Sequence, residues 1–218
     1  MNYTLSTREG ALREQLAARL LTLPPDGRNI SQQQLFVKTA KILYRLERRC
    51  LQQPFSAPLT APLFPAEFMH AFFFAAERLA AQSGRRLDFT TTCDNILCCA
   101  WEERRVVAAL SLLLHALFLV SADLRVSVTT KGAAVYVFIT AGQQKTTVKP
   151  FVSLRDFAAA ATVAHAHKGT LIFDGRAVVF SLPTGLEPVL AVNPYAGQEA
   201  LYLIDELNCL RLAFYSLS

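Results

Sequence analysis

The sequence predicts an α+β fold: a two-layer α/β sandwich with helices on one face of a mixed, mostly antiparallel sheet, preceded by an N-terminal α-helical hairpin. Apolar residues recur with a helical period within the first 53 residues, and they alternate with a period of two in stretches between residues 86 and 182. The expected elements follow the order helix, strands, helix, hairpin, helix, hairpin. This order favours one sheet with helices on one face.

The composition points to a folded chain that stays off the membrane. Its 218 residues suit one medium domain with an appendage, and 52% hydrophobic content with 15 Phe is enough for a large core. The longest apolar run, residues 106–120, is shorter than the ~20 residues that a membrane-spanning helix needs. The N-terminus lacks the pattern of a signal peptide. We therefore expect a cytoplasmic protein.

The first 53 residues carry the charge of the whole chain. They hold nine Lys or Arg against four Asp or Glu, which equals the net charge of +5 for all 218 residues. The five cysteines show neither a CxxC motif nor a Cys/His ligand spacing, so we expect reduced thiols and no metal site.

Residues 1–53 predict a helical hairpin. Residues 6–22 read as a helix, the Pro24-Pro25 and Asp26-Gly27 pairs interrupt it, and a second helix begins near Ile30. Two such helices cannot bury both apolar stripes alone, so they need another copy or another domain. The apolar stripe of the second helix is predicted to comprise Leu35, Thr39, Ile42, Leu43, Leu46 and Cys50.

A basic stripe follows the second helix, well away from the apolar one. It could contact nucleic acid or an acidic protein surface. It lacks interleaved aromatic residues and any known nucleic-acid motif, so we expect a solvated face and no nucleic-acid partner. Its members are Lys38, Lys41, Arg45, Arg48 and Arg49.

The remaining elements follow a Pro-rich linker, residues 54–63. We expect domain boundaries that give a hairpin (1–53), the linker, a main domain (64–183) and a C-terminal extension (184–218). That extension could pack across a cleft or extend the sheet, and its secondary structure stays open. The expected helices are 65–83, 102–120 and 157–166, and the expected strands are 86–92, 96–100, 124–130, 134–140, 170–173 and 177–182.

From Phe64 to Pro183, this order resembles the ATP-binding domain of the histidine kinase, gyrase, Hsp90 and MutL superfamily. Arg104–Ala116 resembles the family's N-box helix, and Val135–Gly142 resembles the strand that leads to its first glycine box. The most specific match is AHAHKGTL, residues 164–171, which is similar to the family's HGG(T) turn. The resemblance implies that the N-terminal hairpin is a relic of the kinase dimerisation hairpin.

The residues that would bind nucleotide differ from the family's. In the family, an N-box Asn holds Mg²⁺ and a second Asn lies one turn earlier; those positions hold His115 and Ser111 here. The Asp-x-Gly-x-Gly box matches Thr140 to Gln144, where only Gly142 is retained, and the second glycine box matches residues 154–156. Mg²⁺ prefers oxygen ligands. The resemblance therefore implies a lost ATP site, with vestigial positions at Ser111, His115, Thr140 and Gly142 and with no catalytic residue, metal or cofactor.

The phosphoacceptor expected of a kinase hairpin is also missing, because none of the four histidines lies in residues 1–53. The resemblance then implies a non-catalytic scaffold, or pseudokinase, of bacterial two-component signalling. It would be a homodimer through the hairpin and would bind a receiver domain or a kinase. The alternative is a divergent ATP-binding histidine kinase or ATPase with a rebuilt site that uses Mg²⁺ and ATP. Whether the chain is an enzyme stays open, and we favour that it is not.

The histidines allow structural as well as chemical roles. His115 could be a ligand or a proton carrier, but we expect a hydrogen-bonded helix residue. His165 and His167 could clamp a metal, but we expect a solvated pair at a helix C-terminus.

Overall fold

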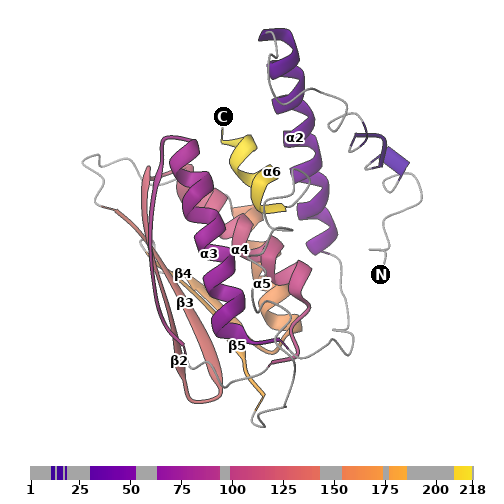
Figure 1. Ribbon diagram of the computed structural model, residues 1–218. Coiled ribbons are helices and arrows are strands. Elements are labelled where there is room, and N and C mark those ends of the chain that lie inside the picture. The colour runs from indigo at the N-terminus through magenta and orange to yellow at the C-terminus, as the bar shows by residue number, and fades with distance from the viewer. Residues whose placement is uncertain are drawn as a thin grey trace.

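The computed structural model describes residues 30–52, 63–93, 99–142, 154–173, 177–185 and 209–217, together with residues 11, 12, 14–16 and 18 of an N-terminal helical segment. The predicted turn at 23–29, most of the linker and residues 186–208 lie outside the described residues. Figure 1 shows the arrangement. The helices are α2 (Ile30–Leu51), α3 (Pro65–Gln82), α4 (Glu103–Phe118), α5 (Leu154–Ala166) and α6 (Cys209–Ser216). The strands are β1 (Arg86–Thr92), β2 (Asp123–Lys131), β3 (Ala134–Ala141), β4 (Thr170–Phe173) and β5 (Ala177–Pro183).

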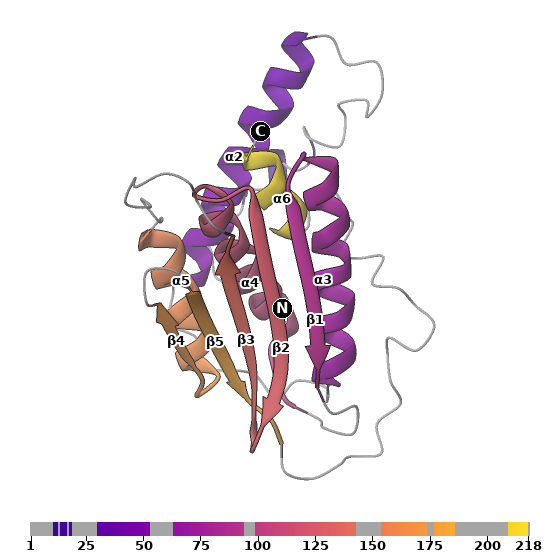
Figure 2. The same ribbon diagram turned by 90° about the vertical axis from the view of Figure 1, so that its left-hand side faces the viewer.

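The strands form one mixed sheet with the order β1-β2-β3-β5-β4. β1 and β2 run parallel, whereas the other neighbouring pairs are antiparallel. Figure 2 shows the helices gathered on one face of this sheet. The predicted two-layer α/β sandwich with a mostly antiparallel sheet is confirmed.

The alternating pattern of the strands fixes which face of the sheet meets the helices. In β2, Leu124, Val126 and Val128 are buried, while Arg125 and Ser127 between them are exposed. Gly132 takes φ +60° in the turn between β2 and β3, and Gly84 takes φ +69° where α3 ends. Both glycines adopt the left-handed conformation that other residues disfavour, as expected where a hairpin turns and a helix ends.

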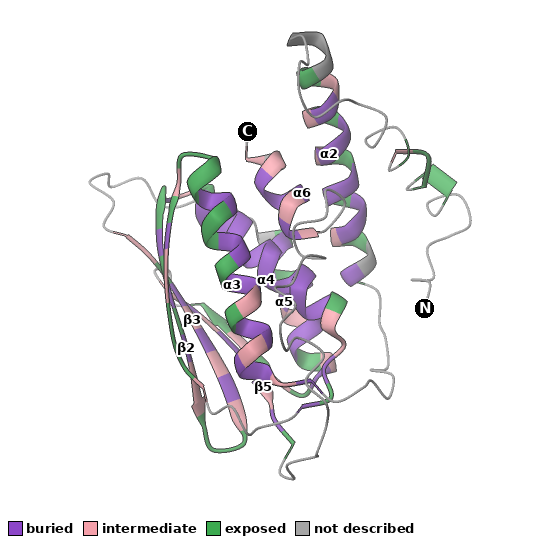
Figure 3. Cartoon of the chain, viewed as in Figure 1, coloured by how far each residue is buried: buried purple, intermediate pink, exposed green. Residues whose placement is uncertain are grey.

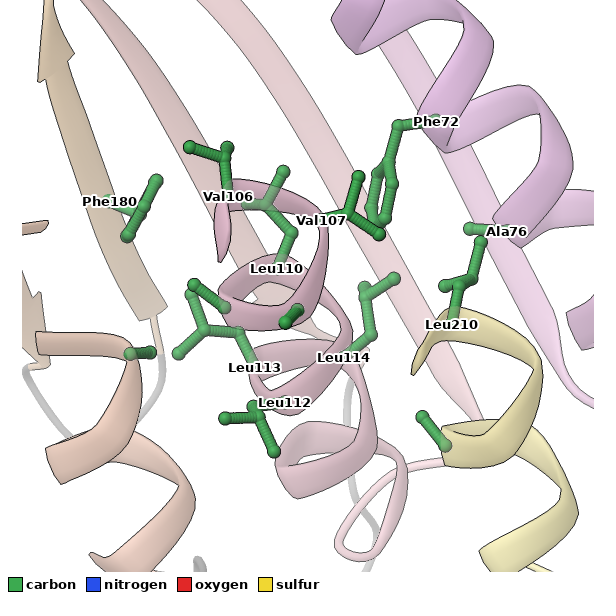
Figure 4. Packing of buried hydrophobic residues seen from close by; sticks show 14 of the residues in the cluster. Phe72, Ala76, Val106, Val107, Leu110, Leu112, Leu113, Leu114, Phe180 and Leu210 are labelled. Carbon is green, nitrogen blue, oxygen red and sulfur yellow. The ribbon is translucent and has the colours of Figure 1, made fainter. Parts of the chain in front are cut away.

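The centre of the molecule is α4. Every residue from Arg105 to Phe118 is buried, because the helix is surrounded by the sheet, α5, α6 and α2, with Phe72 of α3 beside Val107 (Figure 4). Figure 4 shows Phe72 of α3, Phe180 of β5 and Leu210 of α6 around the leucines of α4. A helix that is apolar all round is expected inside a protein, which explains the composition of residues 106–118, whereas Leu119, beyond the end of the helix, is 53% exposed.

Helix α2 buries one face against the rest of the chain. It contacts α4, α5 and α6, and its Phe36 ring lies 4.7 Å from the ring of Tyr215. The predicted apolar stripe is wrong at Ile42, which is 41% exposed. The buried face is rotated from that stripe, because the large rings of Phe36 and Tyr44 point toward α6 and α4. Its most buried members are Phe36, Thr39, Ala40, Leu43, Tyr44 and Leu51. Cys50's side chain lies outside the described residues.

The described part of the C-terminal extension is helical and joins the helix layer. α6 packs against α2 and α4, and Phe214 lies 5.5 Å from Phe118 between ring centroids. α6 therefore does not extend the sheet. In Figure 3, the sides of the helices that face one another are buried.

The predicted strand at 96–100 is described only at its end, where Cys99 forms an isolated bridge with Leu63. Within the described ranges, no helix is long and apolar enough to cross a membrane. The domain boundaries stay predictions, although α2 and α6 both pack on the main domain.

Candidate functional site

Four polar side chains meet where α2, α4 and α5 come together. Arg48 Nη1 lies 2.9 Å from Asp156 Oδ1, and His115 Nδ1 lies 3.2 Å from Asp156 Oδ2. Asp156 is fully buried, so both of its oxygens are paired away from water. The ring of Tyr44 lies 4.5 Å from the His115 ring. We call Tyr44, Arg48, His115 and Asp156 the α2 docking cluster.

The charges of the docking cluster favour an ionised Asp156. Burial alone raises the pKa of this carboxyl group, but hydrogen bonds and charges from His115 and Arg48 lower it below its usual value. The pKa of Tyr44 is raised well above its ordinary value, first by burial and then by the negative charge of Asp156. Tyr44 Oη is buried with no partner at hydrogen-bond distance among the described residues, although the Asp156 carboxylate is near enough to add a hydrogen-bonding contribution to the rise in its pKa. Tyr44 is therefore a neutral phenol that covers His115.

The other three positions that the resemblance matched to the nucleotide site are hydrogen-bonded within their own helix or sheet. Ser111 is fully buried, and its hydroxyl donates to the Val107 carbonyl at 2.6 Å in the same helix. Thr140 is exposed on β3, and its hydroxyl lies 3.4 Å from the Arg125 carbonyl. The Gly142 amide donates to the Asp123 carbonyl at 2.7 Å. Of the four positions, His115 is the one that reaches a charged partner on another helix.

His167 corrects the expected pair of solvated histidines. His165 is exposed, but His167 is buried. His167 Nε2 accepts a hydrogen bond from the Glu102 amide at 2.9 Å, so Nδ1 carries the proton and donates to the Val163 carbonyl at 2.8 Å. Burial lowers the pKa of His167, so the ring is neutral. This histidine joins the end of α5 to the start of α4.

The turn after α5 requires its glycine. A Cβ on Gly169 would lie 1.9 Å from the Ser181 carbonyl oxygen, so no side chain fits there. Lys168 takes φ +60°, a conformation that glycine favours. Nearby, the Trp101 indole donates to the Pro183 carbonyl at 2.7 Å. This backbone packing keeps the start of α4 against the end of β5.

The sequence pattern does not predict two members of the docking cluster. The periodicity predicts Arg48 on the exposed basic stripe, but Arg48 turns inward to Asp156, and Tyr44 carries no signal in the pattern. A signal was present, because Asp156 precedes the apolar run FAAAATVA and a carboxylate beside a buried face needs a partner. Among the described residues, no group of three or more His, Cys, Asp or Glu is placed to hold a metal ion.

Comparisons with known proteins point to one fold. No family model matches the sequence, and no curated protein matches it. Among solved structures, full-length ShkA in complex with AMPPNP has a TM-score of 0.50 and 14% identity, over 84% of this chain and 46% of that chain. Acinetobacter baumannii histidine kinase AdeS has a TM-score of 0.47 and 13% identity, over 79% and 92%. Histidine kinase ThkA, bound to the response regulator TrrA, has a TM-score of 0.47 and 14% identity, over 80% and 57%.

At these identities the likeness concerns the fold. The expected order of elements from Phe64 to Pro183, the buried α4 helix and the tight turn at Gly169 agree with it. The chain has a histidine-kinase-like ATPase fold.

Proposed function

We propose that this chain is a non-catalytic, histidine-kinase-like scaffold that has lost its nucleotide site and acts by binding other proteins. The observation that carries the proposal is the docking cluster. By resemblance, His115 stands where a kinase keeps its magnesium ligand, and here it pairs with Asp156, which in turn pairs with Arg48 of α2. His115 and Asp156, which the resemblance places in the nucleotide site, thus hold α2 in place through Arg48.

The residues present do not fit a magnesium nucleotide. His115 offers nitrogen, whereas Mg²⁺ takes oxygen ligands in a tight octahedron, and its Nδ1 is already bonded to Asp156. The Ser111 hydroxyl donates to its own helix. Asp156, ionised because its pKa is lowered, is a negative group in the region where the family frames phosphate.

The position of α2 adds to this argument. The Tyr44 ring lies against the His115 ring, and Arg48, also on α2, pairs with Asp156 beside it. Helix α2 therefore covers His115 on this side. A ligand that approached His115 from this side would have to displace a helix that is also held by Phe36 and Tyr215.

The partner follows from the resemblance alone and is a signalling protein such as a receiver domain or a kinase. The proposed homodimer must use surfaces other than the buried face of α2, because that face is covered within one chain. Light scattering tests the assembly: one chain weighs 24.1 kDa, and the homodimer predicts twice that mass.

Titration calorimetry with Mg·ATP and Mg·ADP tests the loss of the site. An active histidine kinase catalytic domain, measured under the same conditions, is the positive control. The proposal predicts no heat of binding up to millimolar nucleotide.

The alternative is a divergent histidine kinase or ATPase that uses Ser111, His115, Thr140 and Gly142. It predicts micromolar binding, lost in His115→Ala and Thr140→Ala but kept in Thr129→Ala. Thr129 lies on β2 and serves as the matched control. Such a result would overturn the scaffold proposal.

A further inference from the structure

The exposed face of α2 carries positive charge, and no ion pair to a carboxylate is found for it among the described residues. Glu47 is the one acidic residue in the sequence of α2, and it is 8% exposed. Arg48 turns inward to Asp156. Neither of these residues adds charge to the outer surface of the helix. The four cations that remain, which we call the outer basic stripe, are the exposed Lys38, Arg45 and Arg49 and the half-buried Lys41.

The outer basic stripe is straight and points away from the core. At 3.6 residues per turn, its four members fall within a sector of about 80°, opposite the face that contacts α4 and α6. From Lys38 to Arg49 the stripe spans about 17 Å along the helix axis, at a rise of 1.5 Å per residue. α2 lies at the edge of the helix layer (Figure 1). The outer basic stripe is therefore a row of positive charges along the solvent-facing side of α2.

The residue composition around the outer basic stripe distinguishes a protein partner from a nucleic-acid partner. The core of a protein–protein interface is depleted in charge and enriched in aromatic residues. Here the large exposed hydrophobic residue of α2 is Ile42, at one flank of the stripe. The surroundings are polar: Gln34 and Gln52, which fall in the same sector of the helix, are exposed. Interfaces with nucleic acid are more polar and much more positive than those between proteins.

In place of the solvated face without a nucleic-acid partner that the sequence led us to expect, we propose that the outer basic stripe binds the phosphate backbone of a double-stranded nucleic acid without reading its sequence. A duplex presents one negative charge per ~1.7 Å of its axis, so a line of four cations over about 17 Å can lie along successive phosphates. Glutamine side chains at the same surface can donate to phosphate oxygens. This activity is additional to the scaffold role, because the stripe lies opposite the docked face.

Fluorescence anisotropy with a labelled 25-base-pair duplex DNA of mixed sequence tests the proposal on the full chain. Four released counterions predict a slope of about −3 to −4 for the logarithm of the binding constant against the logarithm of salt concentration. The double variant Lys38→Gln/Arg45→Gln should weaken binding at low salt and bring the slope to about −2. A duplex RNA of the same sequence should bind with a similar slope, because the proposed contacts are to phosphate.

The matched control is Lys131→Gln/Arg125→Gln, which removes the same net charge from exposed positions on β2. It should bind like the unmodified chain. Equal loss in both double variants would overturn the proposal, as would the absence of binding at about 50 mM salt. Poly-glutamate that carries the same total charge as the DNA should not displace the DNA completely from the protein. Complete displacement would also overturn the proposal, because it would show that the stripe binds an acidic protein surface.

Discussion

Arg48 and Asp156 are 108 residues apart in the sequence, yet their side chains pair at 2.9 Å and join α2 to α5. Asp156 is fully buried and Arg48 is 18% exposed, so the pair lies largely out of water. The second carboxylate oxygen holds His115 of α4. One carboxylate thus connects three helices, at the place where the resemblance puts a nucleotide.

Replacing Asp156 by Asn should destabilise the fold. Removing one partner of a buried ion pair costs about 3–5 kcal/mol, and the partial exposure of Arg48 reduces this to about 2–4 kcal/mol. Asn keeps the volume, so the loss reports on charge and not on a cavity. Urea unfolding, followed by the fluorescence of Trp101, measures the free energy.

The matched control for that change is Asp88→Asn. Asp88 pairs with Arg86 at the same 2.9 Å, but the side chains of Arg86 and Asp88 are 72% and 44% exposed. Exposed pairs contribute little, so the unfolding midpoint should not move. Equal shifts in Asp88→Asn and Asp156→Asn would contradict the assigned role of Asp156.

Tyr44→Phe should leave stability unchanged or raise it slightly. The hydroxyl of Tyr44 is buried without a hydrogen-bond partner among the described residues, whereas the ring contacts His115. Phe keeps the ring and removes a polar group that burial disfavours. Thermal unfolding of Tyr44→Phe and Tyr44→Leu separates ring from hydroxyl: the Leu variant should melt lower. A large loss in Tyr44→Phe would show that the hydroxyl is bonded.

Acidification should weaken the fold through His167. Because the folded pKa of His167 is lowered, the unfolded chain binds this proton more tightly. The contribution of His167 is fully present above its unfolded pKa of about 6.5 and is lost as pH falls through the folded pKa. The lowered pKa of Asp156 acts in the same direction below its usual value of 3.8.

His167→Gln isolates the first of these two windows. Gln can still accept from the Glu102 amide but does not titrate. The free energy of unfolding should therefore fall less between pH 8 and pH 5 in the variant than in the unmodified chain. Parallel pH profiles for both proteins would refute a neutral, buried His167.

Gly169→Ala should be strongly destabilising. The added Cβ would overlap the Ser181 carbonyl, which belongs to the backbone and cannot rotate away. We expect a loss of about 3 kcal/mol, at the upper end of the range for overpacking. Gly84→Ala is the comparison: Gly84 has a φ of +69°, which strains an alanine, but its Cβ would meet open space, whereas Gly169 does not have a positive φ and meets a backbone carbonyl. The cost of Gly84→Ala should be about 1–2 kcal/mol, and equal losses at both glycines would remove the packing argument.

Local patterns predicted most of the main domain. Alternation in residues 124–140 and 170–182 gave both hairpins, and Gly84 and Gly132 occupy the positive-φ positions that their places require. The apolar circumference of residues 106–118 predicted a buried helix. These features depend on neighbours in the sequence, so the sequence suffices to find them.

The docking cluster depends on contacts that no local pattern contains. Arg48 recurs with Lys38 and Arg45 at a helical spacing, and this spacing predicts that its side chain faces solvent. In the structure it faces inward, because it donates a hydrogen bond to Asp156, 108 residues away in the sequence. Ile42 and His167 were misplaced for the same reason, because α6 decides which side of α2 is covered and α4 supplies the donor to His167. A contact between two single polar residues that are far apart in the sequence does not change the spacing of apolar residues, so that spacing cannot predict it.

Calorimetric titration of Mg·ATP into the unmodified chain and into Arg48→Met tests the central claim most directly. Arg48→Met weakens the hold of α2 and leaves His115 and Ser111 in place. If the nucleotide site is lost, neither protein gives heat of binding up to millimolar nucleotide. Micromolar binding by either would contradict the account, and binding confined to Arg48→Met would show that α2 covers a working site.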